Sequence, residues 1–98
     1  MSSANKPRLL FSRHAVIKMF ARRITVQDVS SVIESGETIS RYSDKTPFSK
    51  RLLLGYVGNR PLHVVVADDV EAATSIVVTT YHPDPSQWEP DSRTRRNS

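Results

Sequence analysis

The chain has 98 residues, a formal net charge of +4 and no cysteine. This length suits one small domain with its own core, and no apolar stretch reaches the length of a signal-peptide core or a membrane span. The composition excludes disulfides, thiolate metal sites and a cysteine nucleophile. We therefore expect a soluble cytoplasmic protein without a membrane segment.

Charge is distributed unevenly along the chain. Residues 1–27 contain six Lys and Arg and no acid, whereas residues 28–82 contain five bases and seven acids. A basic N-terminal third joined to a mildly acidic remainder favours an anionic partner such as nucleic acid. A solvated helix face explains the same charges without any partner, so this alternative stays open.

Residues 12–23 have the pattern of an amphipathic helix, with Ser12 as a suitable N-cap. Four apolar residues fall at the i, i+1, i+4, i+5 spacing that makes one apolar face: Ala15, Val16, Met19 and Phe20. His14, Lys18 and Arg22 follow one another at intervals of four residues. The predicted helix therefore places a histidine and two cations in one row.

A second helix is predicted directly after the first. Thr25 with Asp28 three residues later resembles a capping box, and Gly36 is placed to end the helix. Its apolar stripe comprises Val26, Val29, Val32 and Ile33. Only about two residues join the two helices, so we expect a tight helical corner.

The remaining apolar runs are short and rich in β-branched residues, which is typical of strands. They cover residues 37–42, 51–57, 62–67 and 75–81, and Gly58 with Asn59 suits a hairpin turn. The order of elements predicts an α+β domain. Two N-terminal helices pack on a three- or four-stranded antiparallel sheet.

The central hairpin allows a conditional register. If Val57 faces Leu62, then Tyr56 faces His63 on one side of the sheet. The opposite side is more aliphatic and is expected to pack against the helices; its members are Leu53, Gly55, Val57, Leu62, Val64 and Val66. Trp88 is expected to fold back on the domain as an apolar plug.

The two ends of the chain lack periodic patterns. We expect residues 1–10 to form a flexible leader, residues 11–88 a single folded domain, and residues 89–98 a disordered tail. Residues 43–50, which include Pro47, are predicted to form a loop.

Several short motifs together resemble a small prokaryotic family catalogued as domain of unknown function 4258. The motifs are Phe11-Ser12-Arg13-His14-Ala15, Lys18-Met19, Arg22, Ile24-Thr25, Val29, Gly36-Glu37, Ile39, Tyr42, Leu54-Gly55, Pro61-Leu62-His63-Val64-Val65, Val78-Thr79-Thr80-Tyr81, Pro83 and Trp88. The resemblance covers about residues 11–88, and it departs from the family where Arg23 replaces the usual glycine. If that position requires a positive φ, Arg23 is strained there. The order of elements is also similar to the RelE, ParE and BrnT toxins, by analogy of fold.

The similarity to RelE-like toxins implies cleavage of messenger RNA, a reaction that needs a base, an acid and phosphate-binding cations. His63 and His14 are candidates for base or acid, and Tyr81 or Tyr56 can donate a proton or stack on a nucleobase. The candidate nucleic-acid-binding cations are Arg13, Lys18, Arg22 and Arg23. Each of these has a structural alternative: a packed histidine, a cation near a helix end, or a cross-strand tyrosine. The histidines lack metal-ligand spacing, so neither a metal nor a cofactor is expected.

The function predicted from this resemblance is that of a toxin-like protein that binds RNA or the ribosome and is neutralised by an antitoxin. In its enzymatic form it would be a metal-independent endoribonuclease. The alternative is a non-catalytic module that binds a protein or nucleic acid through the same surface or through a sheet edge. A homodimer formed by edge pairing is also open.

Overall fold

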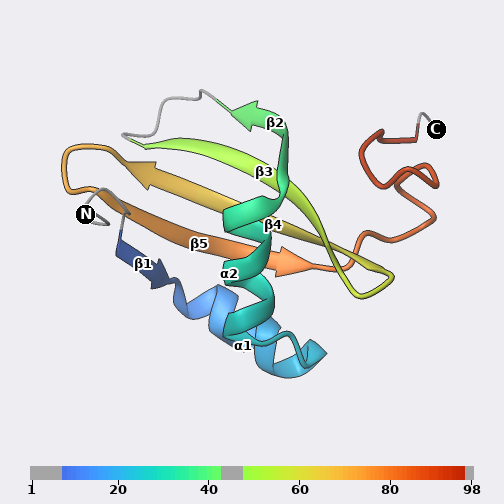
Figure 1. Cartoon of the computed structure of the whole chain (residues 1–98), viewed down its shortest axis with the longest axis horizontal. Helices are drawn as coiled ribbons and strands as arrows, with labels where there is room; N and C mark the ends of the chain where they lie inside the picture. The colour runs from blue at the N-terminus through green and yellow to red at the C-terminus, as the bar shows by residue number, and fades with distance from the viewer. Residues whose placement is uncertain (1–7, 43–47, 97–98) are drawn as a thin grey trace.

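The computed structural model describes residues 8–42 and 48–96. The elements in chain order are β1 (Arg8–Phe11), α1 (Arg13–Arg22), α2 (Val26–Ser35), β2 (Glu37–Tyr42), β3 (Ser49–Val57), β4 (Arg60–Asp69) and β5 (Thr74–Tyr81). The strands form one sheet in the order β1-β5-β4-β3-β2 (Figure 1). The predicted α+β class with two N-terminal helices is confirmed. The predicted strand count was too low, because the sheet has five strands.

The additional strand is β1, which pairs in parallel with β5 from Arg8↔Thr74 to Phe11↔Val77. The other pairs are antiparallel, so the sheet is mixed. Residues 8–10, expected in the leader, therefore belong to the sheet. A strand of four residues is too short to show its own periodicity, and pairing with β5 determines its conformation. The rest of the expected leader, residues 1–7, lies outside the described residues.

Helix α1 continues along β5 beyond the end of β1. The Ser12 hydroxyl accepts a hydrogen bond from the Ala15 N–H (3.0 Å) and donates one to the Val78 carbonyl (2.9 Å). The predicted N-cap therefore also ties the helix to the strand. At the other end of the helix, Arg23 adopts the left-handed conformation (φ 59°, ψ 38°). The position where the family usually has glycine therefore does require a positive φ, and Arg23 is strained there.

Helix α2 has the predicted capping box. The Asp28 N–H donates to Thr25 Oγ1 (3.0 Å), and the Thr25 N–H donates to Asp28 Oδ2 (3.1 Å). Gly36 ends the helix, but in an extended conformation. A Cβ at Gly36 would lie 2.4 Å from the Val32 carbonyl oxygen, so close approach of backbone explains this glycine.

The β3–β4 hairpin has a tighter turn than expected. Val57 pairs with Arg60 and Gly55 with Leu62, so the conditional pairing of Val57 with Leu62 was wrong by two residues. His63 consequently faces Leu54. Because a two-residue shift preserves the side-chain alternation, the predicted helix-facing side is the one that is packed. Gly58 (φ 62°) makes the short turn feasible.

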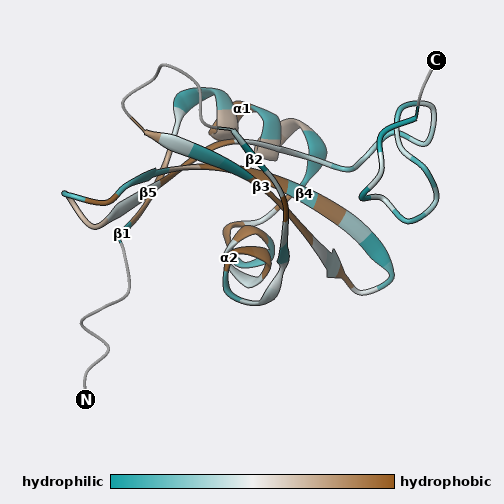
Figure 2. Ribbon diagram, turned by 90° about the horizontal axis from the view of Figure 1, so that it is seen from above, coloured by the Kyte–Doolittle hydropathy of each residue, from teal (hydrophilic) through white to brown (hydrophobic). Residues whose placement is uncertain are grey.

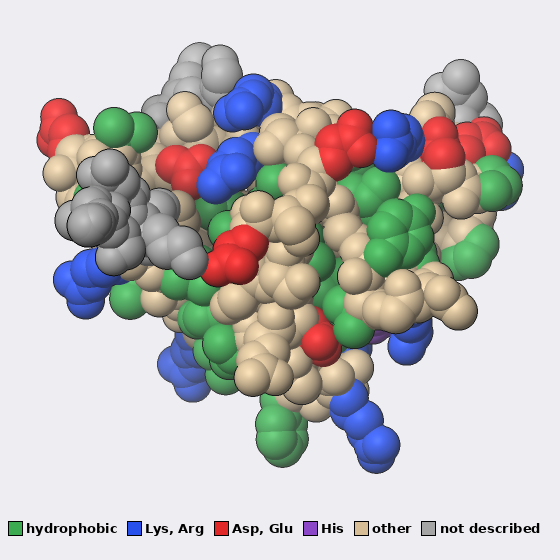
Figure 3. All heavy atoms as spheres, viewed as in Figure 1, with side chains coloured by type: hydrophobic (Ala, Val, Ile, Leu, Met, Phe, Trp, Pro, Cys, Tyr) green, Lys and Arg blue, Asp and Glu red, His purple; other side chains and the backbone are tan. Residues whose placement is uncertain are grey.

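The core lies between this side of the sheet and the helices. Its buried members are Ala15, Met19, Ile24, Val29, Val32, Leu53, Leu62, Val64, Val66 and Val77. Figure 2 shows α2 within the concave side of the curved sheet. In the space-filling view, hydrophobic and basic side chains project together at the lower edge, where α1 lies (Figure 3).

Residues 83–96, called here the C-terminal segment, cover part of the opposite side of the sheet. Trp88 is 5% exposed, consistent with the predicted plug. Residues 89–96, expected in a disordered tail, make specific contacts such as Glu89 N–H to the Thr94 carbonyl (2.8 Å). Turn hydrogen bonds to Asp91 organise this stretch without any periodic pattern. Ser49 and Lys50, expected in the loop of residues 43–50, belong instead to β3, where they pair with β4. Residues 43–47 of that loop and residues 97–98 lie outside the described part.

Candidate functional site

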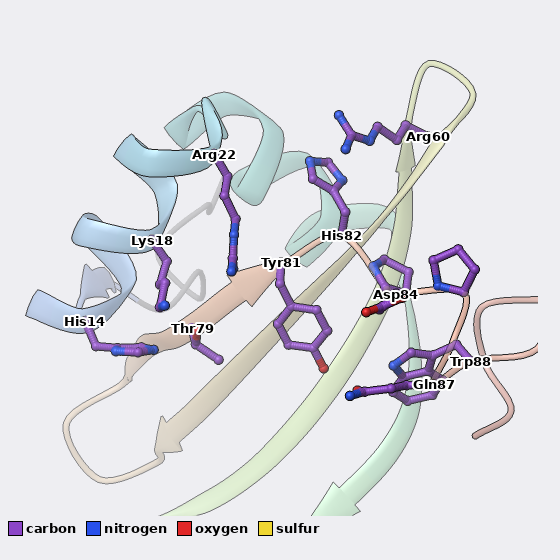
Figure 4. A pocket seen from close by; sticks show the side chains of 12 residues that line it. His14, Lys18, Arg22, Arg60, Thr79, Tyr81, His82, Asp84, Gln87 and Trp88 are labelled. Carbon is purple, nitrogen blue, oxygen red and sulfur yellow. The ribbon is translucent and has the colours of Figure 1, made fainter. Parts of the chain in front are cut away.

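A groove of about 850 Å³ separates α1 from the C-terminal segment (Figure 4). Its lining residues are His14, Lys18, Arg22, Arg60, Thr79, Tyr81, His82, Pro83, Asp84, Pro85, Gln87 and Trp88. Thr79 and Tyr81 come from β5 and form the floor, on the sheet face opposite α2. Three candidates from the sequence, His14, Lys18 and Arg22, form one wall as a single row of α1, as their spacing predicts.

The groove is rich in cations that lack acidic partners. Among the described residues, Lys18, Arg22 and Arg60 form no ion pair, whereas ion pairs do occur elsewhere, as between Arg51 and Asp68 (2.7 Å). Asp84 is the acid in the described lining, and hydrogen bonds from Ser86 hold the pKa of its carboxyl below its usual value. The groove therefore combines three cations with one carboxylate, an arrangement that attracts anions.

The cationic surface continues beyond the groove. A second hollow of about 250 Å³ shares Arg22, Arg60 and His82 with the groove and adds Arg23 and Asp28 to its lining. The left-handed conformation of Arg23 places this residue at the corner between α1 and α2. The two hollows form one track that passes around the C-terminal end of α1.

His82 was not among the candidates selected from the sequence. Its Nδ1 lies 3.0 Å from the Pro61 carbonyl oxygen, which can only accept a hydrogen bond. The neutral ring therefore carries its proton on Nδ1, and Nε2 is left able to accept a proton. No sequence pattern around His82 predicts this contact, because His82 is an isolated histidine at the end of a strand and its partner Pro61 is distant in the sequence.

Tyr81 lies between the groove and the interior. Its ring contacts that of His63 edge-on, with centroids 5.3 Å apart. Burial raises the pKa of the Tyr81 phenol, and the neighbouring Tyr42 acts in the same direction. The hydroxyl therefore stays protonated at neutral pH and can act as a hydrogen-bond donor.

His63 is buried beneath the C-terminal segment and does not line the groove. Its exposed fraction is 0%, its Nε2 donates to the Ser92 carbonyl at 2.6 Å, and its ring lies 4.5 Å from that of Trp88. Burial lowers the pKa of this imidazole, against the opposing effect of the Ser92 hydrogen bond. Its Nδ1 has no partner among the described residues. A neutral histidine enclosed in this way has no path to a substrate.

The remaining candidates are spread over the surface. Arg13 is exposed and lies outside the groove lining. Tyr56 lines a different hollow, between α2 and β3. The structure thus brings His14, Lys18, Arg22 and Tyr81 together, adds His82 and Arg60, and places His63, Arg13 and Tyr56 elsewhere.

Within residues 8–42 and 48–96, no three His, Asp or Glu side chains gather as a metal site. Neither helix of the described chain is long and apolar enough to cross a membrane.

Comparison with known proteins supports the family resemblance. Residues 11–82 match a family model described as "Domain of unknown function (DUF4258)". No curated protein and no solved structure matches the chain. The similarity to RelE, ParE and BrnT toxins therefore stays a prediction. Because the family match spans well over half of the sequence, the chain belongs to the DUF4258 family.

Proposed function

We propose that this protein is a toxin-like RNA-binding protein whose groove between α1 and the C-terminal segment holds a single strand. One observation carries the proposal: Lys18, Arg22 and Arg60 converge on one groove without an ion pair among the described residues. Unpaired cations beside aromatic side chains are the combination used to bind single-stranded nucleic acid.

The geometry of α1 suits a phosphate backbone. His14, Lys18 and Arg22 are four residues apart, so successive side chains are about 6 Å apart along the helix axis. This separation is comparable with the spacing of phosphates along an extended strand. Tyr81, on the floor of the groove, offers aromatic surface to a base, whereas the Trp88 ring is 5% exposed and packs against His63 (Figure 4).

The same groove holds groups suited to cleavage by the RNA 2′-hydroxyl. In that reaction the 2′-oxygen bonds to phosphorus and the bond from phosphorus to the 5′-oxygen breaks, leaving a 2′,3′-cyclic phosphate. His82 Nε2 is the proposed base that takes the 2′-hydroxyl proton. Tyr81, whose hydroxyl is protonated at neutral pH, is the proposed acid for the 5′-oxygen, although its raised pKa makes it a weaker acid than an ordinary tyrosine. Lys18 and Arg22 stabilise the phosphate as charge develops.

The binding proposal is tested with a fluorescein-labelled single-stranded RNA, by anisotropy at several salt concentrations. Three phosphate contacts predict a slope of log K against log salt of about −2, and Arg22→Ala should reduce its magnitude by about 0.7. Arg41→Ala, an exposed arginine of β2 outside the groove lining, is the matched control and should leave the slope unchanged. Equal effects of Arg22→Ala and Arg41→Ala would contradict a specific groove.

The catalytic proposal is tested on the same RNA by gel analysis of products and by growth arrest on induced expression. His82→Ala should abolish 2′,3′-cyclic phosphate products and arrest, while RNA affinity changes little. His63→Phe keeps an aromatic ring against Tyr81 and Trp88. If the variant retains the native fluorescence of Trp88, cleavage should stay intact, because His63 does not line the groove.

A second candidate function is nucleic-acid binding without cleavage. Two observations favour it: His14 and His82 lie toward opposite ends of the groove, so they cannot act together as acid and base (Figure 4). Burial also raises the pKa of Tyr81, the remaining candidate acid, and so makes it a weaker proton donor. RNA binding that depends on Arg22, with no product from the native chain, would select this candidate over the nuclease.

A further inference from the structure

Helix α1 has a third face that neither the core nor the groove uses. Val16, Ile17 and Phe20 are 51%, 56% and 87% exposed, respectively. The predicted apolar face of this helix was therefore too wide, because the core covers only Ala15 and Met19 and leaves Val16 and Phe20 exposed. At about 100° per residue, the three exposed side chains and Arg13 share an arc of about 100° on the side away from Lys18 and Arg22. None of the three apolar residues lines the groove. The face is therefore separate from the proposed RNA site.

Exposure on this scale has a consequence for binding. Single exposed apolar residues are common, but three within five residues of one short helix, including a phenylalanine that is 87% exposed, form a patch. Figure 3 shows hydrophobic and basic side chains projecting together from the edge where α1 lies. Aromatic side chains at such positions are frequent anchors of protein interfaces.

The charge around the patch identifies the chemistry of its partner. Arg13 lies within the arc, Arg23 follows the helix, and α1 contains no acidic residue. The complement of this surface is an apolar stripe flanked by carboxylates.

Two other occupants fit less well. A second copy in a symmetric dimer would place arginines of one α1 against those of the other, and such like-charge contact is unfavourable. A membrane would bury only three apolar side chains of this helix. The free energy of that burial is comparable with the marginal membrane binding of a single acyl chain.

We propose that the outer face of α1, formed by Arg13, Val16, Ile17 and Phe20, is a docking site for an acidic amphipathic helix of a second protein. Apolar residues of that helix at positions i, i+3 and i+4 cover Phe20 and Ile17. Its carboxylates pair with Arg13, which lies outside both hollows. The site goes beyond the proposed RNA binding and uses a different side of the same helix.

The probe is a fluorescein-labelled peptide of about 20 residues with leucine and glutamate at helical spacing, long enough to populate a helix. Two matched peptides replace the glutamates by lysine or the leucines by serine. We expect saturable binding of the leucine–glutamate peptide alone. Phe20→Ser should weaken this binding about tenfold or more. Val70→Ser is the matched control, because Val70 is also 87% exposed but lies between β4 and β5, away from α1.

The outcomes separate the possible occupants. Phe20→Ser should leave RNA binding unchanged, so loss of peptide binding alone supports a separate docking face. Absence of peptide binding, or equal effects of Phe20→Ser and Val70→Ser, would overturn the proposal. Self-association in sedimentation velocity that Phe20→Ser abolishes would replace it with a homodimer. Binding to anionic vesicles but not to the peptide would replace it with a lipid surface.

Discussion

At the scale of single residues, backbone conformation explains the departure of this chain from the family pattern. Arg23 has φ 59° and donates its N–H to the carbonyls of Met19 and Phe20, so it caps α1 in the left-handed region. Glycine adopts this conformation without steric cost, whereas a Cβ makes it unfavourable by about 1 kcal/mol or more. The arginine side chain, in turn, adds a cation to the track beside the groove.

Arg23→Gly should therefore stabilise the fold. We expect the free energy of unfolding to rise by about 0.5–1 kcal/mol and the melting temperature by a few degrees for a domain of this size. Thermal melting followed by circular dichroism measures the change. Arg22→Gly, one residue earlier in helical conformation, is the control and should destabilise by about 0.5–1 kcal/mol. Destabilisation by both substitutions would show that strain at Arg23 is negligible.

At the scale of elements, the close approach of α2 to β3 determines how the helix sits on the sheet. A Cβ at Gly55 would lie 2.7 Å from Val32 Cγ2. Gly55 is half-buried within the strand, and Val32 is 2% exposed at the centre of α2. The glycine therefore serves the packing of two elements rather than a turn.

Gly55→Ala should destabilise the protein by about 1–3 kcal/mol through overpacking against Val32. Val32→Ala makes a cavity and should also destabilise, but the double variant should be more stable than the sum of the two effects predicts. Urea unfolding of the native chain and the three variants forms a double-mutant cycle. If the effects of Gly55→Ala and Val32→Ala on the free energy of unfolding were strictly additive, contact with Val32 would not be the reason why Gly55→Ala destabilises the protein.

At the scale of the whole molecule, the C-terminal segment both covers His63 and forms one wall of the groove. It covers His63 through Trp88 and the Ser92 carbonyl, and residues 83–85 with Gln87 and Trp88 form one wall of the groove. Arg93 also pairs with Glu37 on β2 (2.6 Å). The wall of the groove is therefore held by contacts with distant parts of the sheet.

The stability of this arrangement should depend on pH through His63. Its folded-state pKa is below the ordinary value of 6.5, so the unfolded chain binds more protons when the pH falls below that value. The contribution of His63 should be constant above about pH 6.5 and should decrease below it, with a slope of at most about 1.4 kcal/mol per pH unit. Urea unfolding at several pH values measures the slope, and the fluorescence of Trp88, the single tryptophan of the chain, reports on the segment.

Two variants identify the histidine responsible. His63→Phe should flatten the pH dependence just below pH 6.5, whatever its effect on stability at pH 7.5. His14→Gln, which removes an exposed histidine, should keep the native slope. If the stability of His63→Phe depended on pH as steeply as that of the native chain, groups other than His63 would be responsible.

Local patterns in the sequence were sufficient for much of the fold. The caps at Ser12 and Thr25, the row of His14, Lys18 and Arg22, and the helix-facing side of the central hairpin were all predicted, because spacing along one element determines which side chains share a face. Strand β1 could not be predicted, since its conformation depends on pairing with β5, far away in the sequence.

The composition of the candidate site was decided by tertiary structure. His63 lies within β4 and His82 directly follows β5, yet the C-terminal segment buries His63 and leaves His82 in the groove with Arg60. The sequence by itself determined the helices, the strands of the hairpin and the cationic row of α1. Which histidine faces solvent depended on how residues 83–96 cross the sheet, and this path is set by long-range contacts that no local pattern encodes.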